Sequence, residues 1–588
     1  MSDMSRELEN IKKRVSSGYG IARFLHEHGI KHVFGVPDGR TLGFYDGLLA
    51  VEGIDHVLLN DERSAAFAAD AYSRVTGLVG VCDSGAAGAM NFPIALAEAK
   101  GSASSVLAII GVVKADDMLK NIPHDIKVAE TLEPVTKWTG KVLTSNHLPR
   151  FLNYAIKMAV NGKPGPVALV IAEDAITSSD IKLKEFIPRT SGSCSINSCR
   201  TAPATNEIEE AVRLIQRSKQ PAIYCGGGAI LSRAFQEVKQ LSEMLIAPVF
   251  STISGKGIMP SNGDTTNNLY FGTIGLFGES PNHKFVRRRA DLLIVVGNRL
   301  TEDDTANFKV PTQKTEMIQI DVDSAEIGLS YHPFGVVGDP KVALFEFIEK
   351  LSEYGITSFE NEEEILRTRK QNIEELRENH NIYRAEDLTL WLDKEPIKPQ
   401  RVLKAISDNF TKSDYLVTDA SASARWIGAY FPVKGVGRKI ITPRGVGPTG
   451  FGVGALIGTC IAADLFTNGS NKPKKVLFTG DGGLMNGGIN EFETIKKLDL
   501  DCTIVVINNS SLGFVKFGQA MLYDKRYYDT DRPQTNFARL TEAFGGTGFR
   551  VEKLSQLDST IQQAIKSEGF NLVDVVVDPL ELLPPNFY

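Results

Sequence analysis

Two segments near the C-terminal end combine glycine, a carboxylate and side-chain amides in a pattern suited to a phosphate group and a metal ion. An apolar run, Val476-Leu477-Phe478-Thr479, leads into Gly480-Asp481-Gly482-Gly483, and a second run, Thr503 to Ile507, ends at Asn508-Asn509. Glycines let backbone N–H groups approach a phosphate closely. Mg2+ takes oxygen ligands, and it commonly uses one or two from protein while phosphate and water supply the others. The two segments therefore predict a site for a diphosphate and Mg2+.

A second group of chemistry-bearing residues lies far upstream, where Asn60-Asp61-Glu62-Arg63 opens an alanine-rich run that continues to Tyr72-Ser73-Arg74-Val75-Thr76-Gly77. Together with the C-terminal segments, this run resembles the thiamine diphosphate enzymes grouped with acetolactate synthase and pyruvate oxidase. In that family a glutamate hydrogen-bonds to the aminopyrimidine ring and activates the cofactor, so the resemblance implies that Glu62 is catalytic. The similarity covers nearly the whole chain, from about Val33 to about Val577.

The resemblance also assigns the remaining cofactor and metal contacts. Mg2+ would be held by Asp481, Asn509 and the backbone carbonyl of Ser511. The spacing between the two metal segments is longer than usual in the family by an extra residue within Asn486-Gly487-Gly488, so Asn508 stays an alternative ligand. The residues expected to contact the cofactor are Glu62, Asn91, Ser421, Gly447, Thr449, Gly480, Asp481, Gly482, Gly483, Asn509, Ser511, Leu512 and Gly513.

Several positions depart from the family pattern. Thr449 stands where a bulky apolar residue usually bends the cofactor, and Gly85-Ala86-Ala87-Gly88 replaces a Gly-Pro-Gly. Pro123-His124-Asp125 replaces a Phe-Gln-Glu, and His124 is predicted either to donate a hydrogen bond to a bound acid or to be a surface loop histidine. The tryptophan that helps acetolactate synthases choose an acceptor has no match around Phe517-Gly518. These departures leave the substrate open.

The middle of the chain raises the question of a flavin. Gly226-Gly227-Gly228, Gly275-Leu276-Phe277-Gly278 and Gly297-Asn298-Arg299 fall where relatives contact FAD. Other relatives keep such glycines while holding ADP or nothing, because glycine also serves tight strand-to-helix turns. FAD, ADP and no ligand are therefore all retained as alternatives.

Composition excludes several classes of function. The chain has 588 residues, 42% of them hydrophobic, and a formal net charge of -6, which indicates neither nucleic acid nor an anionic membrane as a partner. No long apolar stretch suggests a membrane span, and the N-terminus lacks the pattern of a signal peptide, so a cytoplasmic protein is expected. Cys194 and Cys199 share a polar segment and are predicted to be free thiols.

Short apolar runs alternate with amphipathic stretches, which predicts an α/β fold of three doubly wound parallel-sheet domains. The predicted pyrimidine-binding domain covers residues 1–185, the central domain 205–352, a solvated helical linker 353–395 and the diphosphate-binding domain 396–588. The segment Ser178 to Asn206 is interpreted as an exposed connection, and Ile489 to Leu498 as a helix. Predicted strands are Ala168–Ile171, Ala222–Tyr224, Leu292–Val296 and Met317–Ile320.

The resemblance implies decarboxylation of a 2-oxo acid, pyruvate being the first choice, followed by carboligation to a second carbonyl compound. A soluble flavin-linked oxidoreductase and a catalytically silent cofactor-binding paralogue are the alternatives. Because relatives enclose each cofactor between two subunits, a homodimer or homotetramer is expected. Fold analogy does not identify the acceptor substrate.

Overall fold

The structure is a computed structural model that describes residues 14–187, 199–261, 268–386, 393–466 and 472–581. These residues form two compact units, which are described separately. The first unit contains residues 1–199, 443–472 and 483–500, and the second contains residues 200–442, 473–482 and 501–588, within the described ranges. No helix in the described ranges is long and apolar enough to cross a membrane.

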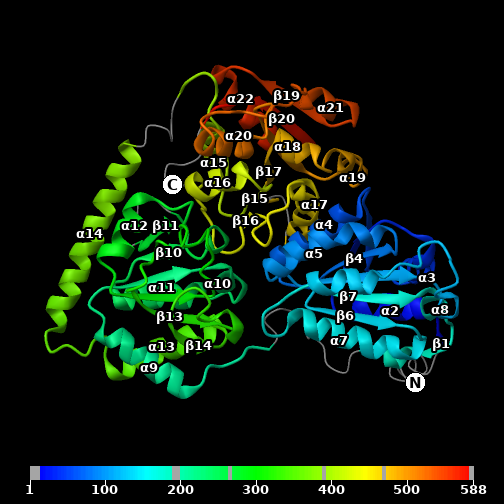
Figure 1. Ribbon diagram of the computed structural model, residues 1–588, viewed down its shortest axis with the longest axis horizontal. Helices are drawn as coiled ribbons and strands as arrows, with labels where there is room; N and C mark the ends of the chain where they lie inside the picture. The colour runs from blue at the N-terminus through cyan, green and yellow to red at the C-terminus, as the bar shows by residue number, and fades with distance from the viewer. Residues whose placement is uncertain (1–13, 188–198, 262–267, 387–392, 467–471, 582–588) are drawn as a thin grey trace. The chain divides into compact units, whose positions relative to one another are not determined.

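The first unit is built on one six-stranded parallel sheet with the order β3-β2-β4-β5-β7-β6 (Figure 1). Its strands are β2 (His32–Gly35), β3 (Asp55–Leu58), β4 (Gly80–Gly85), β5 (Val106–Val112), β6 (Trp138–Val142) and β7 (Val167–Ala172). Its helices are α2 (Ser17–Glu27), α3 (Leu42–Leu49), α4 (Glu62–Thr76), α5 (Phe92–Gly101), α6 (Val128–Leu132), α7 (Leu148–Val160), α8 (Glu173–Thr177), α17 (Phe451–Asp464) and α19 (Phe492–Lys497).

The second unit contains two further six-stranded parallel sheets, with the orders β11-β10-β9-β12-β13-β14 and β16-β15-β17-β18-β20-β19. The first comprises β9 (Pro221–Cys225), β10 (Val249–Ser251), β11 (Tyr270–Thr273), β12 (Leu292–Val296), β13 (Glu316–Asp321) and β14 (Phe334–Val337). The second comprises β15 (Tyr415–Thr418), β16 (Ile440–Ile441), β17 (Lys475–Gly480), β18 (Cys502–Asn508), β19 (Thr547–Val551) and β20 (Phe570–Val576). Their helices are α9 (Thr205–Arg217), α10 (Gly227–Leu231), α11 (Phe235–Leu245), α12 (Ser280–Arg288), α13 (Pro340–Tyr354), α14 (Glu362–Glu386), α15 (Pro399–Asp408), α16 (Ala422–Tyr430), α20 (Gly513–Leu522), α21 (Phe537–Ala543) and α22 (Leu554–Lys566). The short helix α18 (Asp481–Met485) spans residues of both units.

Strand β12 shows why these sequences form sheets with both faces covered. Leu292, Ile294 and Val296 pack in one hydrophobic core, whereas Leu293 and Val295 pack in another. Because successive side chains of a strand point to opposite faces, a continuous apolar run requires helices on both sides. The three parallel sheets confirm the predicted fold class, and each of the predicted strands lies inside an observed one.

Helices α4 and α17 of the first unit pack together closely enough to require small residues. A Cβ atom on Gly458 would lie 2.0 Å from the carbonyl oxygen of Ala68, and one on Gly454 would lie 2.7 Å from that of Ser64. Phe67 and Phe451 meet edge to face with ring centroids 5.2 Å apart. This contact fixes the helix that begins at Glu62 against the helix that follows the Gly445–Gly450 loop.

Two segments are more buried than the sequence predicted. The segment interpreted as an exposed connection forms β8 (Ile181–Lys182), which pairs with β1 (Arg14–Val15), and Phe186 is fully buried. The predicted solvated linker contains α14, drawn as one long helix beside α12 in Figure 1. One face of α14 is buried, because the Arg369 side chain donates hydrogen bonds to the carbonyl groups of three residues of the central sheet domain: Ser218, Lys219 and Leu245.

The predicted helix from Ile489 to Leu498 starts as a 3-10 turn, Ile489–Glu491, and continues as α19. Cys199 is a free, exposed thiol, as predicted, and Cys194 lies outside the described residues.

Candidate active site

Glu62 occupies the first position of α4, directly after the N-cap residue Asp61, whose side chain accepts a hydrogen bond from the N–H of Arg63. The Glu62 carboxylate is half-buried and accepts a hydrogen bond from Nδ2 of Asn91 at 2.9 Å. A Cβ atom on Gly88 would come within 2.3 Å of Glu62 Oε1, so a larger residue there would displace the Glu62 carboxylate from its present position. The structure thus brings two of the predicted cofactor residues together.

The loop that leads into α17 carries two more predicted residues, Gly447 and Thr449. Asn486 donates from Nδ2 to the Thr449 carbonyl oxygen at 2.9 Å and to its hydroxyl oxygen at 2.7 Å. Gly447 has positive φ of 70°, and a Cβ atom there would meet no other atom of the described chain within 4 Å. The left-handed backbone conformation accounts for this glycine, and the open space on its Cβ side leaves the backbone accessible to a ligand.

The start of α4 is also held by Glu491, a fully buried carboxyl group in the first unit. The N–H of Asn60 donates to both Glu491 oxygens, at 3.1 and 3.2 Å, and Thr494 Oγ1 donates to Oε2 at 2.8 Å. Burial raises the pKa of Glu491 to about 7, against the opposing effect of these hydrogen bonds. A group that titrates near neutral pH therefore contacts the residue two positions before Glu62.

The predicted metal ligands meet in the second unit, at the carboxyl ends of the adjacent strands β17 and β18. Asp481 follows β17 and is 4% exposed. Burial raises its pKa to about 6, although a backbone hydrogen bond from Ser511 and the nearby charge of Arg532 act in the other direction. The N–H of Ser511 also donates to Asn509 Oδ1 at 3.1 Å. A buried carboxylate beside an amide oxygen suits Mg2+, because the positive charge of the ion would offset the cost of burying the Asp481 carboxylate.

The two neighbouring asparagines have different surroundings. Asn508 is the last residue of β18 and is buried, and its Nδ2 donates to the Thr535 carbonyl oxygen and to Asp574 Oδ1, both at 2.9 Å. Asn509 lies beyond the strand end with its Oδ1 on the Ser511 N–H. The surroundings of Asn508 describe a structural role, which favours Asn509 among the two alternative ligands.

Two non-glycine residues with positive φ lie near the same strand ends. Ser421 follows β15 with φ of 71° and ψ of -142°, and Ser510 has φ of 50°. Non-glycine residues with positive φ are uncommon and gather at functional sites. A Cβ atom on Gly480 would meet no described atom within 4 Å, and one on Gly482 would touch only Leu512, at 3.4 Å. Backbone at this edge is therefore open to a ligand.

Among the described residues, no group of three or more His, Cys, Asp and Glu side chains could hold a metal ion. A metal site would have to combine a carboxylate such as Asp481 with amide and carbonyl oxygens. The predicted residues fall into two groups, each described within its own unit. Glu62, Asn91, Gly447, Thr449 and Gly483 belong to the first unit, and Ser421, Gly480, Asp481, Gly482, Asn509, Ser511, Leu512 and Gly513 belong to the second.

His124 lies in an exposed loop before α6 and has φ of 71°. Its substrate contact stays a prediction.

The three glycine segments predicted to contact FAD follow the carboxyl ends of β9, β11 and β12. A Cβ atom on Gly226 would lie 2.3 Å from the carbonyl oxygen of Gly297, and one on Gly228 would lie 2.8 Å from its Cα. The N–H of Gly228 donates to the Gly297 carbonyl oxygen at 2.9 Å. The packing of the turns after β9 and β12 accounts for glycine at 226, 228 and 297 without a ligand, so the identity of a central-domain ligand stays open.

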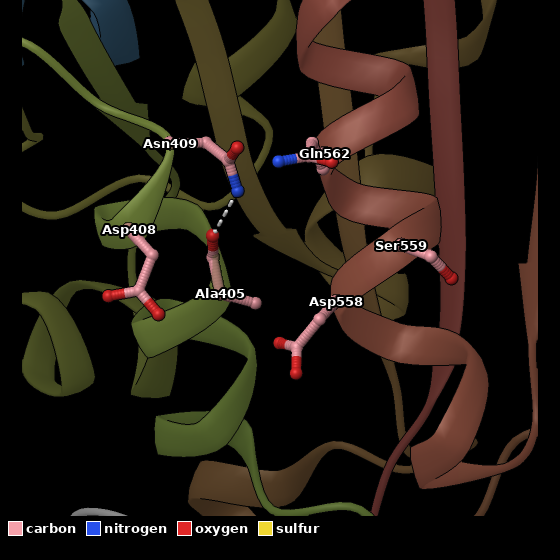
Figure 2. Close-up of a pocket in the computed structure, with 6 residues that line it drawn as sticks. All are labelled: Ala405, Asp408, Asn409, Asp558, Ser559 and Gln562. Carbon is pink, nitrogen blue, oxygen red and sulfur yellow. Dashed lines mark hydrogen bonds between the residues drawn. The ribbon is translucent and has the colours of Figure 1, made fainter.

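A groove of about 230 Å3 lies between α15 and α22. Figure 2 shows its lining side chains, Ala405, Asp408, Asn409, Asp558, Ser559 and Gln562. Its two carboxylates already have cationic partners, since Lys404 binds Asp408 and Arg401 binds Asp558. The lining contains no predicted cofactor residue, and we do not assign it as the active site.

Sequence reasoning missed Glu98, Asn486 and Glu491, each of which contacts a predicted cofactor segment. Glu98 had a weak signal, because it directly follows the apolar run Phe92–Ala97 in the same helix, and a carboxylate that is buried there needs a partner. Asn486 and Glu491 had none, because their partners lie far away in the sequence.

Comparisons with known proteins agree with this geometry. Family models of thiamine pyrophosphate enzymes match the chain in three parts: the N-terminal TPP binding domain over residues 17–131, the central domain over 208–351 and the C-terminal TPP binding domain over 419–575. A probable acetolactate synthase large subunit of Methanococcus aeolicus is 30% identical, over 95% of this chain and 92% of its own length. The acetolactate synthase isozyme 3 large subunit of Escherichia coli is 29% identical, over 96% of this chain and 95% of its own.

The expected family is therefore confirmed along nearly the full length of the sequence. The chain is a member of the thiamine diphosphate-dependent enzymes, in the family of the acetolactate synthase large subunits.

Proposed function

We propose that this enzyme decarboxylates a 2-oxo acid, pyruvate, and joins the remaining fragment to a second carbonyl compound, with thiamine diphosphate and Mg2+ as cofactors. The observation that carries the proposal is Glu62, presented at the start of α4 with Asn91 and Gly88 beside its carboxylate. The relatives that match the chain are named acetolactate synthases, which does not favour the flavin-linked oxidoreductase alternative.

The bound cofactor supplies the electron sink that makes loss of CO2 from a 2-oxo acid feasible. Glu62 holds a proton at the aminopyrimidine ring, and Asn91 orients the Glu62 carboxylate through its 2.9 Å hydrogen bond. Thr449 and Gly447 lie in the loop that contacts the same ring. Because Asn486 binds both oxygens of Thr449, this loop is oriented before the cofactor arrives.

On the diphosphate side, Asp481, the amide oxygen of Asn509 and the Ser511 carbonyl bind Mg2+. The open backbone at Gly480 and Gly482 admits the phosphate groups. Without a metal ion, burial raises the pKa of Asp481 to about 6, and a cation held by this carboxylate would favour its ionised form. Ser421, with its strained backbone, lies in the loop that contacts the diphosphate.

The active assembly is a homodimer or a homotetramer. This proposal comes from the family resemblance, in which two subunits enclose each cofactor. Sedimentation combined with activity measured on dilution tests it, and an active monomer would contradict it.

Incubation of the purified protein with pyruvate, thiamine diphosphate and Mg2+, followed by NMR of the products, tests the proposed reaction. Acetolactate or acetoin formed without an electron acceptor, and absent with the Glu62→Gln variant, supports it. Acetate formed only with FAD and an electron acceptor would instead establish the oxidoreductase. Failure to convert any of a broad panel of 2-oxo acids would indicate the catalytically silent paralogue.

A further inference from the structure

Glu98 of helix α5 binds four consecutive backbone N–H groups of a distant loop. Its carboxylate oxygens accept from the N–H groups of residues 444–447, at 2.9 to 3.1 Å. The side chain is fully buried. A run of N–H groups that converges on one carboxylate is a backbone nest, an arrangement that usually binds an anionic ligand. In the first unit the anion is supplied by the protein itself.

The charge of Glu98 is balanced within the same buried cluster. Arg74 donates to Glu98 Oε1 at 3.0 Å and to Asp70 through two bonds, at 2.8 and 2.5 Å, and Ser102 Oγ donates to Glu98 at 2.7 Å. Two carboxylates and one guanidinium leave one negative charge, which the four N–H groups of the loop offset. Burial opposes ionisation of Glu98, but Arg74 and the loop outweigh it and lower its pKa below the ordinary value.

The loop also lies directly against the backbone of α5. A Cβ atom on Gly445 would come within 2.2 Å of the Glu98 carbonyl oxygen, and one on Gly101 would come within 2.5 Å of the Gly445 Cα. The loop therefore cannot move as a rigid body toward α5, and the Glu98 carboxylate prevents it from moving away. Its next residues are Pro448 and Thr449, and Gly447 is the position whose Cβ side is open.

We propose that Glu98 is a positioning residue for the cofactor: it fixes the Arg444–Gly447 loop in the conformation that receives the aminopyrimidine ring. This inference rests on the proposed function, because the contact between this loop and the aminopyrimidine ring is itself part of that proposal. Glu98 itself does not touch the cofactor. It acts through the four N–H groups that it orders, so its loss raises the entropic cost of cofactor binding.

The test compares Glu98→Gln with Asp70→Asn. The glutamine keeps one oxygen acceptor but loses the charge that serves both Arg74 and the loop. Asp70→Asn removes a carboxylate of the same buried cluster, and the bonds of that carboxylate go to Arg74. Amide hydrogen exchange of the peptide that contains residues 444–447 is measured on the cofactor-free protein. Thiamine diphosphate affinity is measured by calorimetry at saturating Mg2+.

We expect the Glu98→Gln protein to exchange this peptide at least about tenfold faster and to bind thiamine diphosphate about tenfold to hundredfold more weakly, the range for loss of a charge-assisted hydrogen bond. Glu98→Gln and Asp70→Asn are expected to lower the unfolding midpoint by similar amounts. In Asp70→Asn, however, the loop exchange rate and the thiamine diphosphate affinity should stay near the parent values. If Glu98→Gln does not fold, Ser102→Ala removes one bond to the same carboxylate and is expected to speed loop exchange by a smaller factor.

Unchanged loop exchange in Glu98→Gln, or in Ser102→Ala where that variant stands in for it, overturns the inference. Equal effects of Glu98→Gln and Asp70→Asn on the loop also overturn it, because the loop would then respond to general loosening of the cluster. A parent protein that does not bind thiamine diphosphate overturns the proposed function instead, and the exchange experiment still decides whether Glu98 orders the loop.

Discussion

Replacing Glu491 with glutamine removes a buried carboxyl group that titrates close to neutral pH. Burial is the largest cause of its raised pKa, which moves from 4.5 to about 7 on folding. Between these two values the folded protein binds more protons than the unfolded chain, so the wild-type protein loses stability as the pH rises. The full difference corresponds to about 3 kcal/mol. Above about pH 7 both states are ionised and the loss is complete.

The glutamine variant lacks this titration, so its free energy of unfolding relative to wild type should rise with pH. Part of the wild-type stability loss has already occurred at about pH 5. Between about pH 5 and about pH 8, the free energy of unfolding of the variant minus that of the wild type should therefore rise by about 2.5 kcal/mol. The measurement is urea unfolding of the cofactor-free proteins at both pH values. Taking the difference between variants removes the contribution of other groups, such as Asp481, that titrate in both proteins.

Glu493→Gln is the matched control, since Glu493 is an exposed carboxylate two positions away on α19. It should change the free energy of unfolding equally at both pH values. If the difference in unfolding free energy between Glu491→Gln and wild type is also the same at both pH values, burial does not raise the pKa of Glu491, and the reasoning is wrong.

Five further variants test other parts of the structure. Asn509→Ala should sharply weaken Mg2+-dependent binding of thiamine diphosphate, measured by calorimetry, whereas Asn508→Ala should mainly lower the unfolding midpoint because it leaves two buried acceptors unpaired. Arg369→Met should lower the free energy of unfolding by about 3 kcal/mol or more in urea titrations, since three carbonyl groups lose a charged donor. Gly458→Ala should cost about 1–3 kcal/mol by the same assay through overpacking between α4 and α17. Gly518→Ala, in the helix α20 with no described atom within 4 Å of the new Cβ, should be neutral or stabilising.

The strands that were predicted are mostly apolar runs, and a run such as Leu292–Val296 can only be buried on both faces. The proximity of Asp481 to residues 509–511 could be predicted for a similar reason, since these residues follow the paired strands β17 and β18, and their contact with a diphosphate stays a prediction. Fold class and the grouping of Asp481 with Asn509 and Ser511 thus depend on short-range sequence patterns.

The contacts that hold the cofactor loops could not be predicted, because they join residues far apart in the chain through single side chains. Glu98 binds residues 444–447, and Glu491 binds Asn60. In both contacts the hydrogen-bond donors are backbone N–H groups, which are not specific to any residue type. The sequence therefore does not show which residues each carboxylate binds. The sequence already favoured Asn509 over Asn508 as the metal ligand, and the hydrogen bonds of the Asn508 amide to Thr535 and Asp574 add a structural reason for that prediction.

Two departures from the family pattern turn out to be in contact. Thr449 stands where the family resemblance places a bulky residue, and Asn486 belongs to the segment in which the resemblance implies an extra residue. The Asn486 amide binds both the hydroxyl and the carbonyl oxygen of Thr449, and a Cβ atom on Gly450 would lie 2.0 Å from the Asn486 carbonyl oxygen. A bulky apolar side chain is held in place by packing, whereas threonine is held here by two hydrogen bonds. Thr449 and Asn486 are therefore parts of one arrangement, in which directed polar contacts fix the loop before α17.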